Sequence, residues 1–274
     1  MIAPGPDTEV RTMRRSGCRL SYRYRPSASG EWVVFLHGAG MDGQMFDAQM
    51  RSVPAGVGII CWDARGHGDS TLQGPFRYAD MCADLDALVA GVNAERLHLV
   101  GQSMGGNVAQ TFVDDNPGTV DRLVLIDCTA NHGPLSRVDQ LALRSTTTVR
   151  SLYPWDLLVR QSARACGTAP ATIAYAEQCL RRIGKRRFVE VMGFWSDALE
   201  PDPSYRVPVP TLGLLGGQDR SGNIRTALTR LDRVDPRVQV VTIPDAAHNS
   251  TMDQPALTNQ PALTNRAVGA FLGW

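Results

Sequence analysis

The chain has 274 residues, of which 43% are hydrophobic and 20% are charged, a composition typical of a globular protein with a sizeable core. The formal net charge of +1 gives no reason to expect nucleic acid or an acidic membrane as a partner. No apolar run approaches the roughly 18 residues of a membrane-spanning helix, and no secretory signal precedes the six cysteines. We therefore expect a cytoplasmic protein with free thiols and no membrane partner.

Apolar runs that alternate with helical patterns predict the fold class. Residues 9–24 alternate loosely and predict an antiparallel hairpin, whereas 78–92 carry an apolar stripe at helical spacing. A continuous apolar run at 32–36 is typical of a strand buried on both faces, and further stretches of strand character occur at 57–62, 97–100, 122–126, 210–215 and 238–243. We therefore predict an α/β protein with a mostly parallel central sheet wrapped by helices, with ligands at the carboxyl ends of the strands.

The alternation stops between residues 131 and 203, where helical segments are broken by proline and glycine and no strand-like run occurs. A segment of this length is too long for a plain connection. It predicts a helical cap at 131–203, inserted into a core formed by 1–130 and 204–274 and lying over the carboxyl edge of the sheet. Several apolar residues are expected to form the core of the cap and, in part, a wall of an apolar pocket: Trp155, Met192, Phe194 and Trp195.

The sequence Gly101-Gln102-Ser103-Met104-Gly105 directly follows the strand at 97–100, and the residues after it repeat at helical spacing. This pattern predicts a strand, a tight turn and a helix, with glycines where a Cβ would collide. The turn presents the Ser103 hydroxyl at the carboxyl edge of the sheet as a candidate nucleophile. The backbone N–H of Met104 is one of the unpaired donors at the start of the helix, so it can receive a developing negative charge.

Two further polar residues follow strands, Asp219 after 210–215 and His248 after 238–243. A serine hydroxyl needs a general base with a pKa near neutrality, which His248 supplies. The histidine in turn needs an acceptor for its second nitrogen, which a buried aspartate supplies. We assign this role to Asp219 and keep Asp127, which also ends a strand, as the alternative acid.

These motifs, in this order, resemble the α/β-hydrolase superfamily, in its branch of capped esterases, lactonases, carbon–carbon hydrolases and cofactor-free haloperoxidases. The matches cover the chain nearly end to end: an oxyanion loop at 37–40, a D-x-R-G-x-G-x-S turn at 63–70, the nucleophile elbow at 101–105, an acid-bearing turn at 217–220 and the histidine loop at His248. The resemblance implies a second oxyanion donor, the N–H of Ala39, beside that of Met104. We expect no cofactor, and no metal site because the five histidines lack the spacing of zinc ligands.

The expected function is hydrolysis of a small apolar ester or lactone through an acyl-enzyme intermediate, by a monomer or homodimer that binds a small-molecule acyl substrate. Residues 40–46 resemble those of enol-lactone hydrolases. The same triad can serve a carbon–carbon bond hydrolase or an acyltransferase, and a non-catalytic ligand-binding protein on a hydrolase scaffold is the alternative from another class. Serine at position 103 argues against haloalkane dehalogenases and epoxide hydrolases, which resemble this fold but carry aspartate there.

Other polar residues have simpler structural interpretations. We expect His37 and the turn at 63–70 to have mainly structural roles, through buried hydrogen bonds and glycine turns. A catalytic role for His37 is the alternative. Asp245 is expected to be a solvated loop residue. His132 is expected to be an exposed loop residue, with a position in the pocket wall as the alternative. The basic run at 181–187 favours a solvated helix face over a site for a substrate carboxylate.

Overall fold

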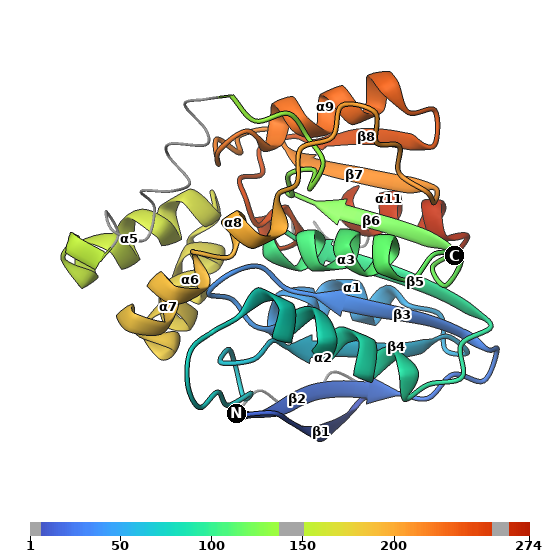
Figure 1. The fold of residues 1–274 in the computed structure, drawn as a ribbon, viewed down its shortest axis with the longest axis horizontal. Helices are drawn as coiled ribbons and strands as arrows, with labels where there is room; N and C mark the ends of the chain where they lie inside the picture. The colour runs from blue at the N-terminus through green and yellow to red at the C-terminus, as the bar shows by residue number, and fades with distance from the viewer. Residues whose placement is uncertain (1–6, 137–150, 254–262) are drawn as a thin grey trace.

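The structure is organised around one β-sheet. It is a computed structural model that describes residues 7–136, 151–253 and 263–274. Within these residues eight strands pair in the order β1-β2-β4-β3-β5-β6-β7-β8 (Figure 1). They are β1 (Glu9–Arg15), β2 (Cys18–Arg25), β3 (Glu31–Leu36), β4 (Gly58–Asp63), β5 (Arg96–Gln102), β6 (Arg122–Ile126), β7 (Thr211–Gly216) and β8 (Val238–Ile243). β2 pairs antiparallel with β1 and with β4, and every other neighbouring pair is parallel. The predicted α/β class with a mostly parallel sheet is confirmed.

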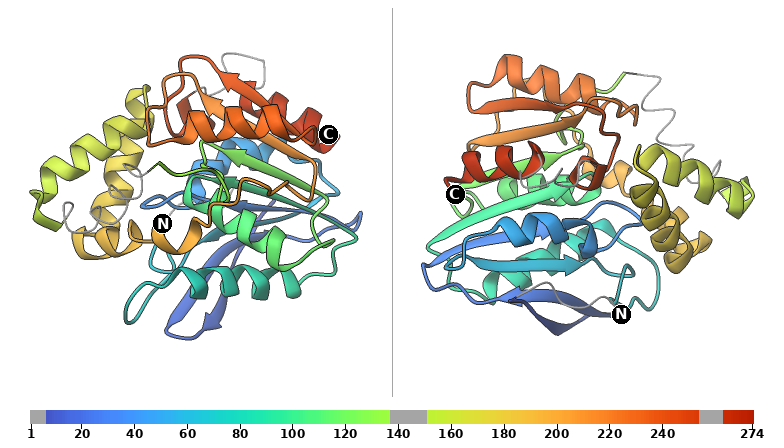
Figure 2. Two further views of the ribbon diagram at one scale, coloured as in Figure 1. Left: turned by 45° about the horizontal axis from the view of Figure 1, so that its top comes forward. Right: turned by 180° about the vertical axis from the view of Figure 1, so that it is seen from behind.

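Helices cover both faces of this sheet (Figure 2). Those outside the predicted cap are η1 (Gly43–Phe46), α1 (Asp47–Ser52), α2 (Tyr78–Ala90), α3 (Met104–Asp115), α9 (Ile224–Val234), α10 (Ser250–Asp253) and α11 (Leu263–Leu272). Strand residues alternate between two hydrophobic cores: Val34 and Leu99 pack with α2 and α3, and Val33 and Val100 pack with α1 and α11. Because helices cover both faces of the sheet, a central strand such as β3 is apolar on both sides, which explains the continuous apolar run at 32–36. Among the helices of the described ranges, none is long and apolar enough to cross a bilayer.

The described part of the segment between β6 and β7 contains helices only. They are α5 (Trp155–Cys166), α6 (Pro170–Ile183), α7 (Lys185–Val191) and α8 (Trp195–Ala198). Helices α5, α6 and α7 lie beyond the arrowheads of β3 and β6, on the left of Figure 1, and so at the carboxyl ends of the parallel strands. Beside α8 the chain packs on the main body, where the ring of Phe194 stacks on Tyr78 of α2 with 6.0 Å between centroids.

Proline and glycine define the boundaries inside this helical segment. Helix α6 begins with Pro170, whose fixed φ suits a first helical position, and ends before Gly184, whose φ is 76°. Residues 137–150 of the predicted cap lie outside the described residues. The division into a core of 1–130 and 204–274 and a cap of 131–203 therefore stays a prediction.

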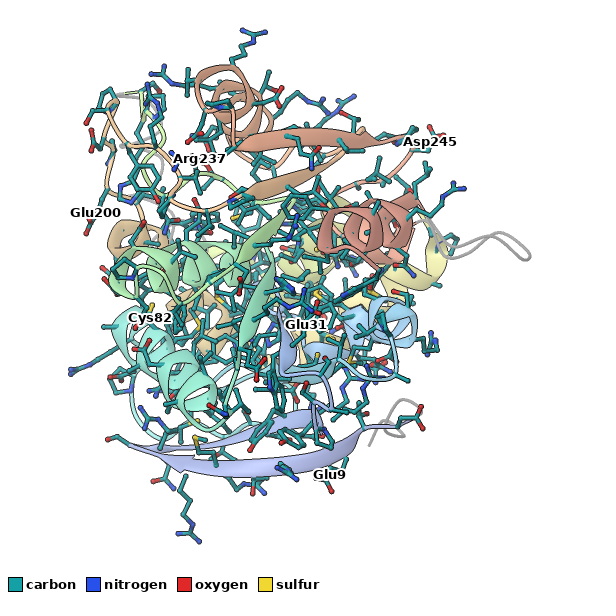
Figure 3. The ribbon with its side chains drawn as sticks, turned by 90° about the vertical axis from the view of Figure 1, so that its right-hand side faces the viewer. Glu9, Glu31, Cys82, Glu200, Arg237 and Asp245 are labelled. Atoms are coloured by element: carbon teal, nitrogen blue, oxygen red, sulfur yellow. The ribbon has the colours of Figure 1, made fainter. Side chains whose placement is uncertain are left out.

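A buried carboxylate holds the amino-terminal edge of the sheet. Glu31, at the start of β3, accepts hydrogen bonds from Nε2 of His98 and from Nε1 of Trp274, each at 3.0 Å, and pairs with Arg96. Figure 3 views the molecule from this side, with Glu31 near the centre. His98 therefore lies toward the end of β5 that is remote from Ser103, so it is no candidate for a base that acts on this serine.

Candidate active site

The turn between β5 and α3 carries Ser103 at the carboxyl edge of the sheet. Its backbone lies at φ 49° and ψ −120°, a strained conformation for a residue with a side chain. A Cβ at Gly101 would lie 2.5 Å from the carbonyl oxygen of Gly105, and one at Gly105 would lie 2.1 Å from that of Leu36. The N–H of Ser103 donates to the carbonyl of Ile126 at 2.9 Å, which joins the turn to β6. Only glycine at both flanking positions allows this close approach.

Three side chains from three loops form a hydrogen-bonded series beside this turn. Nε2 of His248, in the loop after β8, lies 3.0 Å from Oγ of Ser103. Nδ1 of His248 lies 3.0 Å from Oδ2 of Asp219, in the loop after β7, and Oδ1 of Asp219 accepts from the N–H of Ser221 at 2.8 Å. Ser103 and Asp219 are buried and His248 is largely buried. With the proton of the imidazole on Nδ1, Nε2 faces Ser103 as an acceptor.

Burial and charge act in opposite directions on these groups. Burial by itself raises the pKa of Asp219, but the hydrogen bond and the charge of His248 outweigh it, so this pKa lies below its ordinary value. Burial by itself lowers the pKa of His248, but the hydrogen bond to Asp219 and the charges of Asp219 and Asp127 raise this pKa above its ordinary value. Asp219 therefore stays ionised, and it favours the charged form that His248 adopts when it accepts a proton.

Asp127, the alternative acid, contacts other groups. It is fully buried after β6, where Oδ1 accepts from the N–H of Gly216 at 2.6 Å and Oδ2 accepts from the N–H of Ser250 at 3.1 Å. Burial raises the pKa of Asp127 to about 7. Among the hydrogen bonds of the described residues, none joins Asp127 to His248. Its carboxyl group instead ties the end of β7 to the start of α10.

Two backbone N–H groups near Ser103 have no hydrogen-bond partner within the described ranges. Neither the N–H of Ala39 nor that of Met104 donates a hydrogen bond to another described residue. Ala39 lines the cavity in front of Ser103. Met104 is the first residue of α3, where an N–H has no partner within the helix. These are the two positions at which the sequence and its family resemblance predict oxyanion donors.

A cavity of about 700 Å³ opens in front of Ser103 and His248. Its apolar wall comes from α6, α7 and the start of α8, with Leu180, Phe188, Met192 and Trp195. Two other aromatic residues of the predicted cap do not line the cavity: Phe194 is buried, and the ring of Trp155 packs against Phe188 with 6.1 Å between centroids. Polar lining residues come from the end of α5 and from the loop after β7. A cavity of this size and polarity suits a small organic molecule.

Comparison with known proteins identifies the family. A model of the alpha/beta hydrolase family matches residues 33–260, most of the chain. The chain belongs to the alpha/beta hydrolase family. The matched range contains Ser103, Asp219 and His248.

Proteins to which this chain is similar include a lipase, an enol-lactonase and an esterase. It is 28% identical over 242 residues to the sn-1-specific diacylglycerol lipase ABHD11 of Mus musculus, a match that covers 81% of this chain and 76% of that protein. The enol-lactonase from Burkholderia xenovorans LB400 superposes with a TM-score of 0.79 at 20% identity, over 96% of this chain and 100% of that one. A thermophilic esterase from Thermogutta terrifontis superposes with a TM-score of 0.74 at 22% identity, over 96% and 97%. The two solved structures share the fold of this hydrolase.

A residue that sequence reasoning missed links the turn of Ser103 to the loop of His248. Nε2 of Gln102 donates a hydrogen bond to the carbonyl oxygen of His248 at 2.8 Å. Because Gln102 directly precedes Ser103, the turn that presents the hydroxyl also holds the backbone of the histidine. The sequence signal for this contact is the position of Gln102 inside Gly-x-Ser-x-Gly.

A second missed residue, Asp253 at the end of α10, joins the histidine loop to the turn between α5 and α6. Its oxygens accept from the N–H of Thr168 at 2.9 and 3.0 Å, of Ala169 at 3.1 Å and of Ala247 at 2.8 Å. Thr168 and Ala169 form the turn between α5 and α6, and Ala247 precedes His248. The carboxylate is buried and has no cationic partner among the described residues, so these backbone donors compensate its charge.

We expect Asp253→Asn to lower both stability and activity, because an amide offers one acceptor oxygen where the carboxylate offers two. Loss of these buried, charge-assisted bonds predicts a fall of about 2–3 kcal/mol in the free energy of unfolding. Looser placement of His248 predicts a fall of roughly tenfold in kcat. Urea denaturation and steady-state kinetics measure the two effects. The matched control is Asp245→Asn, in the loop that carries His248, whose exposed side chain predicts neither change. Unaltered kinetics in Asp253→Asn would show that this contact does not position His248.

His37 serves a structural role, as its sequence context indicates. It is fully buried, its Nε2 accepts from the N–H of Ala64 at 2.9 Å, and its Nδ1 lies 2.8 Å from the carbonyl oxygen of Gly38. Burial lowers the pKa of His37, which favours the neutral ring. The imidazole thus joins the loop of Ala39 to the turn at 63–70.

Two surface predictions differ in outcome. His132 is partly buried, with Nε2 2.9 Å from a carboxylate oxygen of Asp114 and its ring stacked on Tyr205, so the expected exposed position is wrong. It does not line the cavity among the described residues. Asp245 is exposed, as expected. In the basic run, several arginines pair with acids: Arg181 with Asp156, Arg182 with Asp69, and Arg187 with Glu190.

Proposed function

We propose that the protein is a serine hydrolase that cleaves a small apolar ester or lactone through an acyl-enzyme intermediate. The observation that carries this proposal is the hydrogen-bonded series from Ser103 through His248 to Asp219, at the wall of a cavity of about 700 Å³. A hydroxyl, a base and an orienting carboxylate in this order form the arrangement that activates serine for attack on a carbonyl carbon.

In the first half-reaction, Oγ of Ser103 attacks the carbonyl carbon while Nε2 of His248 accepts the hydroxyl proton. Asp219 keeps the other proton on Nδ1 and stabilises the imidazolium. The bond from the carbonyl carbon to the leaving oxygen then breaks, and His248 returns its proton to that oxygen. In the second half-reaction water attacks the acyl-enzyme with His248 again as base, which releases the acid and restores the Ser103 hydroxyl.

The N–H groups of Ala39 and Met104 are assigned to the substrate's carbonyl oxygen. That oxygen gains negative charge in the tetrahedral intermediate, and donors that are already oriented stabilise it without reorganisation. Each such donor typically contributes ~3 kcal/mol of transition-state stabilisation. Neither N–H donates to another residue that the structure describes, which supports the assignment.

The cavity and the relatives support an ester or lactone with an apolar part. Phe188, Met192 and Trp195 offer apolar contact to an acyl chain or ring. The relatives named above are a lipase, an esterase and an enol-lactonase, which supports a carboxylic ester or lactone bond as the target here. Water is the proposed acceptor of the acyl group.

We also propose a cytoplasmic location. All six cysteines are free thiols in the structure, and most of them are buried. Free thiols persist in a reducing compartment, which supports this location. The oligomeric state, monomer or homodimer, stays a prediction that sedimentation velocity tests.

A fluorophosphonate probe and a substrate panel test the proposed reaction. Mass spectrometry should locate the probe on Ser103, and p-nitrophenyl esters of graded acyl length and a set of lactones should yield free acids. A folded protein that is not labelled at Ser103 would contradict a serine nucleophile. Preferential transfer of the acyl group to an added alcohol would identify an acyltransferase instead.

The raised pKa of His248 predicts where activity is lost at low pH. Only the neutral imidazole accepts the proton of Ser103, so the rate of acylation falls as the pH falls through the pKa of His248. Because Asp219 raises this pKa, the midpoint of the acid limb should lie above the ordinary value of 6.5. The rate of fluorophosphonate labelling against pH measures it without a product-release step. A midpoint clearly below this value would show that burial, and not Asp219, dominates the titration.

A further inference from the structure

The permanent charges that line the cavity at Ser103 are of one sign. Of the lining residues that the structure describes, Arg164 and Arg220 carry a permanent charge, and none is an aspartate or a glutamate. The carboxylate of Asp219 bonds to His248 and does not line the cavity. A molecule that enters therefore meets two positive charges and no carboxylate among these residues.

The two arginines come from two different elements, both of which line the cavity. Arg164 lies in the last turn of α5, and Arg220 directly follows Asp219 in the loop after β7. Both are exposed, and neither makes an ion pair or a hydrogen bond with another described residue. The N–H donors of both guanidinium groups are therefore available to a ligand.

Arg220 is not needed to hold its loop. The guanidinium group of Arg225, from α9, donates to the carbonyl oxygens of Gly216 and Gly217 at 3.2 and 2.9 Å. Oδ1 of Asp219 accepts from the N–H of Ser221 within the loop itself. These contacts fix the loop that carries the triad acid without the side chain of Arg220.

The position of Arg164 has a partial structural explanation. A cation in the last turn of α5 interacts favourably with the negative end of the helix dipole. Arg160, one turn earlier on the same helix, is also exposed but does not line the cavity. The dipole explains a cation near the end of α5, but it does not require a side chain that faces the catalytic cavity.

We infer that Arg164 and Arg220 form a carboxylate subsite, and that the substrate is an ester or lactone that carries a free carboxylate away from the scissile bond. This inference rests on the proposed function of Ser103. A guanidinium group donates two parallel N–H bonds to a carboxylate, and groups from two elements bind it from two sides. The apolar wall of Phe188 and Met192 then contacts the chain between the carboxylate and the acyl carbon.

Paired substrates test this subsite through a selectivity ratio. Each p-nitrophenyl hemiester of adipic or suberic acid is compared with its neutral methyl-capped analogue, and the ratio of their kcat/KM values is measured. The wild-type ratio should exceed one, and Arg164→Gln and Arg220→Gln should each lower it by roughly tenfold. Raising the ionic strength from about 0.01 M to about 1 M should also lower the wild-type ratio, because salt screens the charges of the arginines. The matched control, Arg160→Gln, should leave the ratio unchanged.

Binding to the Ser103→Ala protein tests the subsite without turnover. In calorimetry, monomethyl adipate should bind roughly tenfold or more tightly than dimethyl adipate, and combined Arg164→Gln and Arg220→Gln changes should remove the difference. Equal binding of the two esters would overturn the subsite. Ser103-dependent hydrolysis of the neutral esters, with no preference for the hemiesters, would overturn the subsite and leave the proposed function standing. Tight binding of monomethyl adipate without turnover of either series would support the subsite and contradict the proposed function.

Discussion

Ser103→Ala will leave a folded protein with about 10⁴-fold or more of its esterase activity lost. The hydroxyl is the proposed nucleophile, and its one hydrogen bond to another described residue is to His248. It does not cap α3, and the tight turn depends on Gly101 and Gly105, so its removal takes away no support of the fold. Circular dichroism and thermal unfolding should match the wild type, whereas p-nitrophenyl ester hydrolysis and fluorophosphonate labelling should be lost.

The matched control for this change is Ser196→Ala, at an exposed serine of α8 whose hydroxyl donates to the carbonyl of Gly193. It should retain full activity and full labelling at Ser103. Retention of more than a few per cent of wild-type turnover in Ser103→Ala would remove Ser103 from its assigned role. Loss of folding in Ser103→Ala would show that the hydroxyl supports the strained turn.

The parts of the fold that the sequence predicts are those specified by neighbouring residues. Glycines at 101 and 105 are required locally, because a side chain at either would meet backbone atoms within 2.5 Å. Parallel strands end at one edge, so residues that follow β5, β7 and β8 converge there whatever the details of the loops. The proximity of Ser103, Asp219 and His248 follows from these two facts.

Patterns of neighbouring residues do not predict contacts between segments that are distant in sequence. Asp253 bonds to Thr168, 85 residues earlier, and no local pattern marks that pairing. His132 is covered by Asp114 and Tyr205, which are far from it in sequence, so its own neighbours in the chain do not reveal its burial. Helix α9 is a different case: it is absent from the elements expected from the sequence, although Ile224, Ala227, Leu228 and Leu231 repeat at helical spacing.

Asp219→Asn will lower kcat by about 10⁴-fold with little change in stability. An asparagine presents either an oxygen or an amide nitrogen to Nδ1 of His248. The amide nitrogen favours the tautomer with the proton on Nε2, which then faces Ser103 as a donor and cannot accept its proton. The acid limb of the labelling rate should also move to lower pH, because Asp219 raises the pKa of His248. Steady-state kinetics and the pH profile measure the two effects.

Asp127→Asn is the matched control for the acid assignment, and it should show the opposite pattern. Its two oxygens accept from Gly216 and Ser250, and an amide can accept only one of these bonds, so the free energy of unfolding should fall by about 1–3 kcal/mol. His248 keeps its partner Asp219, so kcat should fall by less than roughly tenfold. A large fall in kcat in Asp127→Asn with only a small fall in Asp219→Asn would make Asp127 the acid that bonds to His248 during catalysis. Comparing the two variants distinguishes the two candidate acids, because both carboxyl groups are buried and, of the two, only Asp219 bonds to Nδ1 of His248.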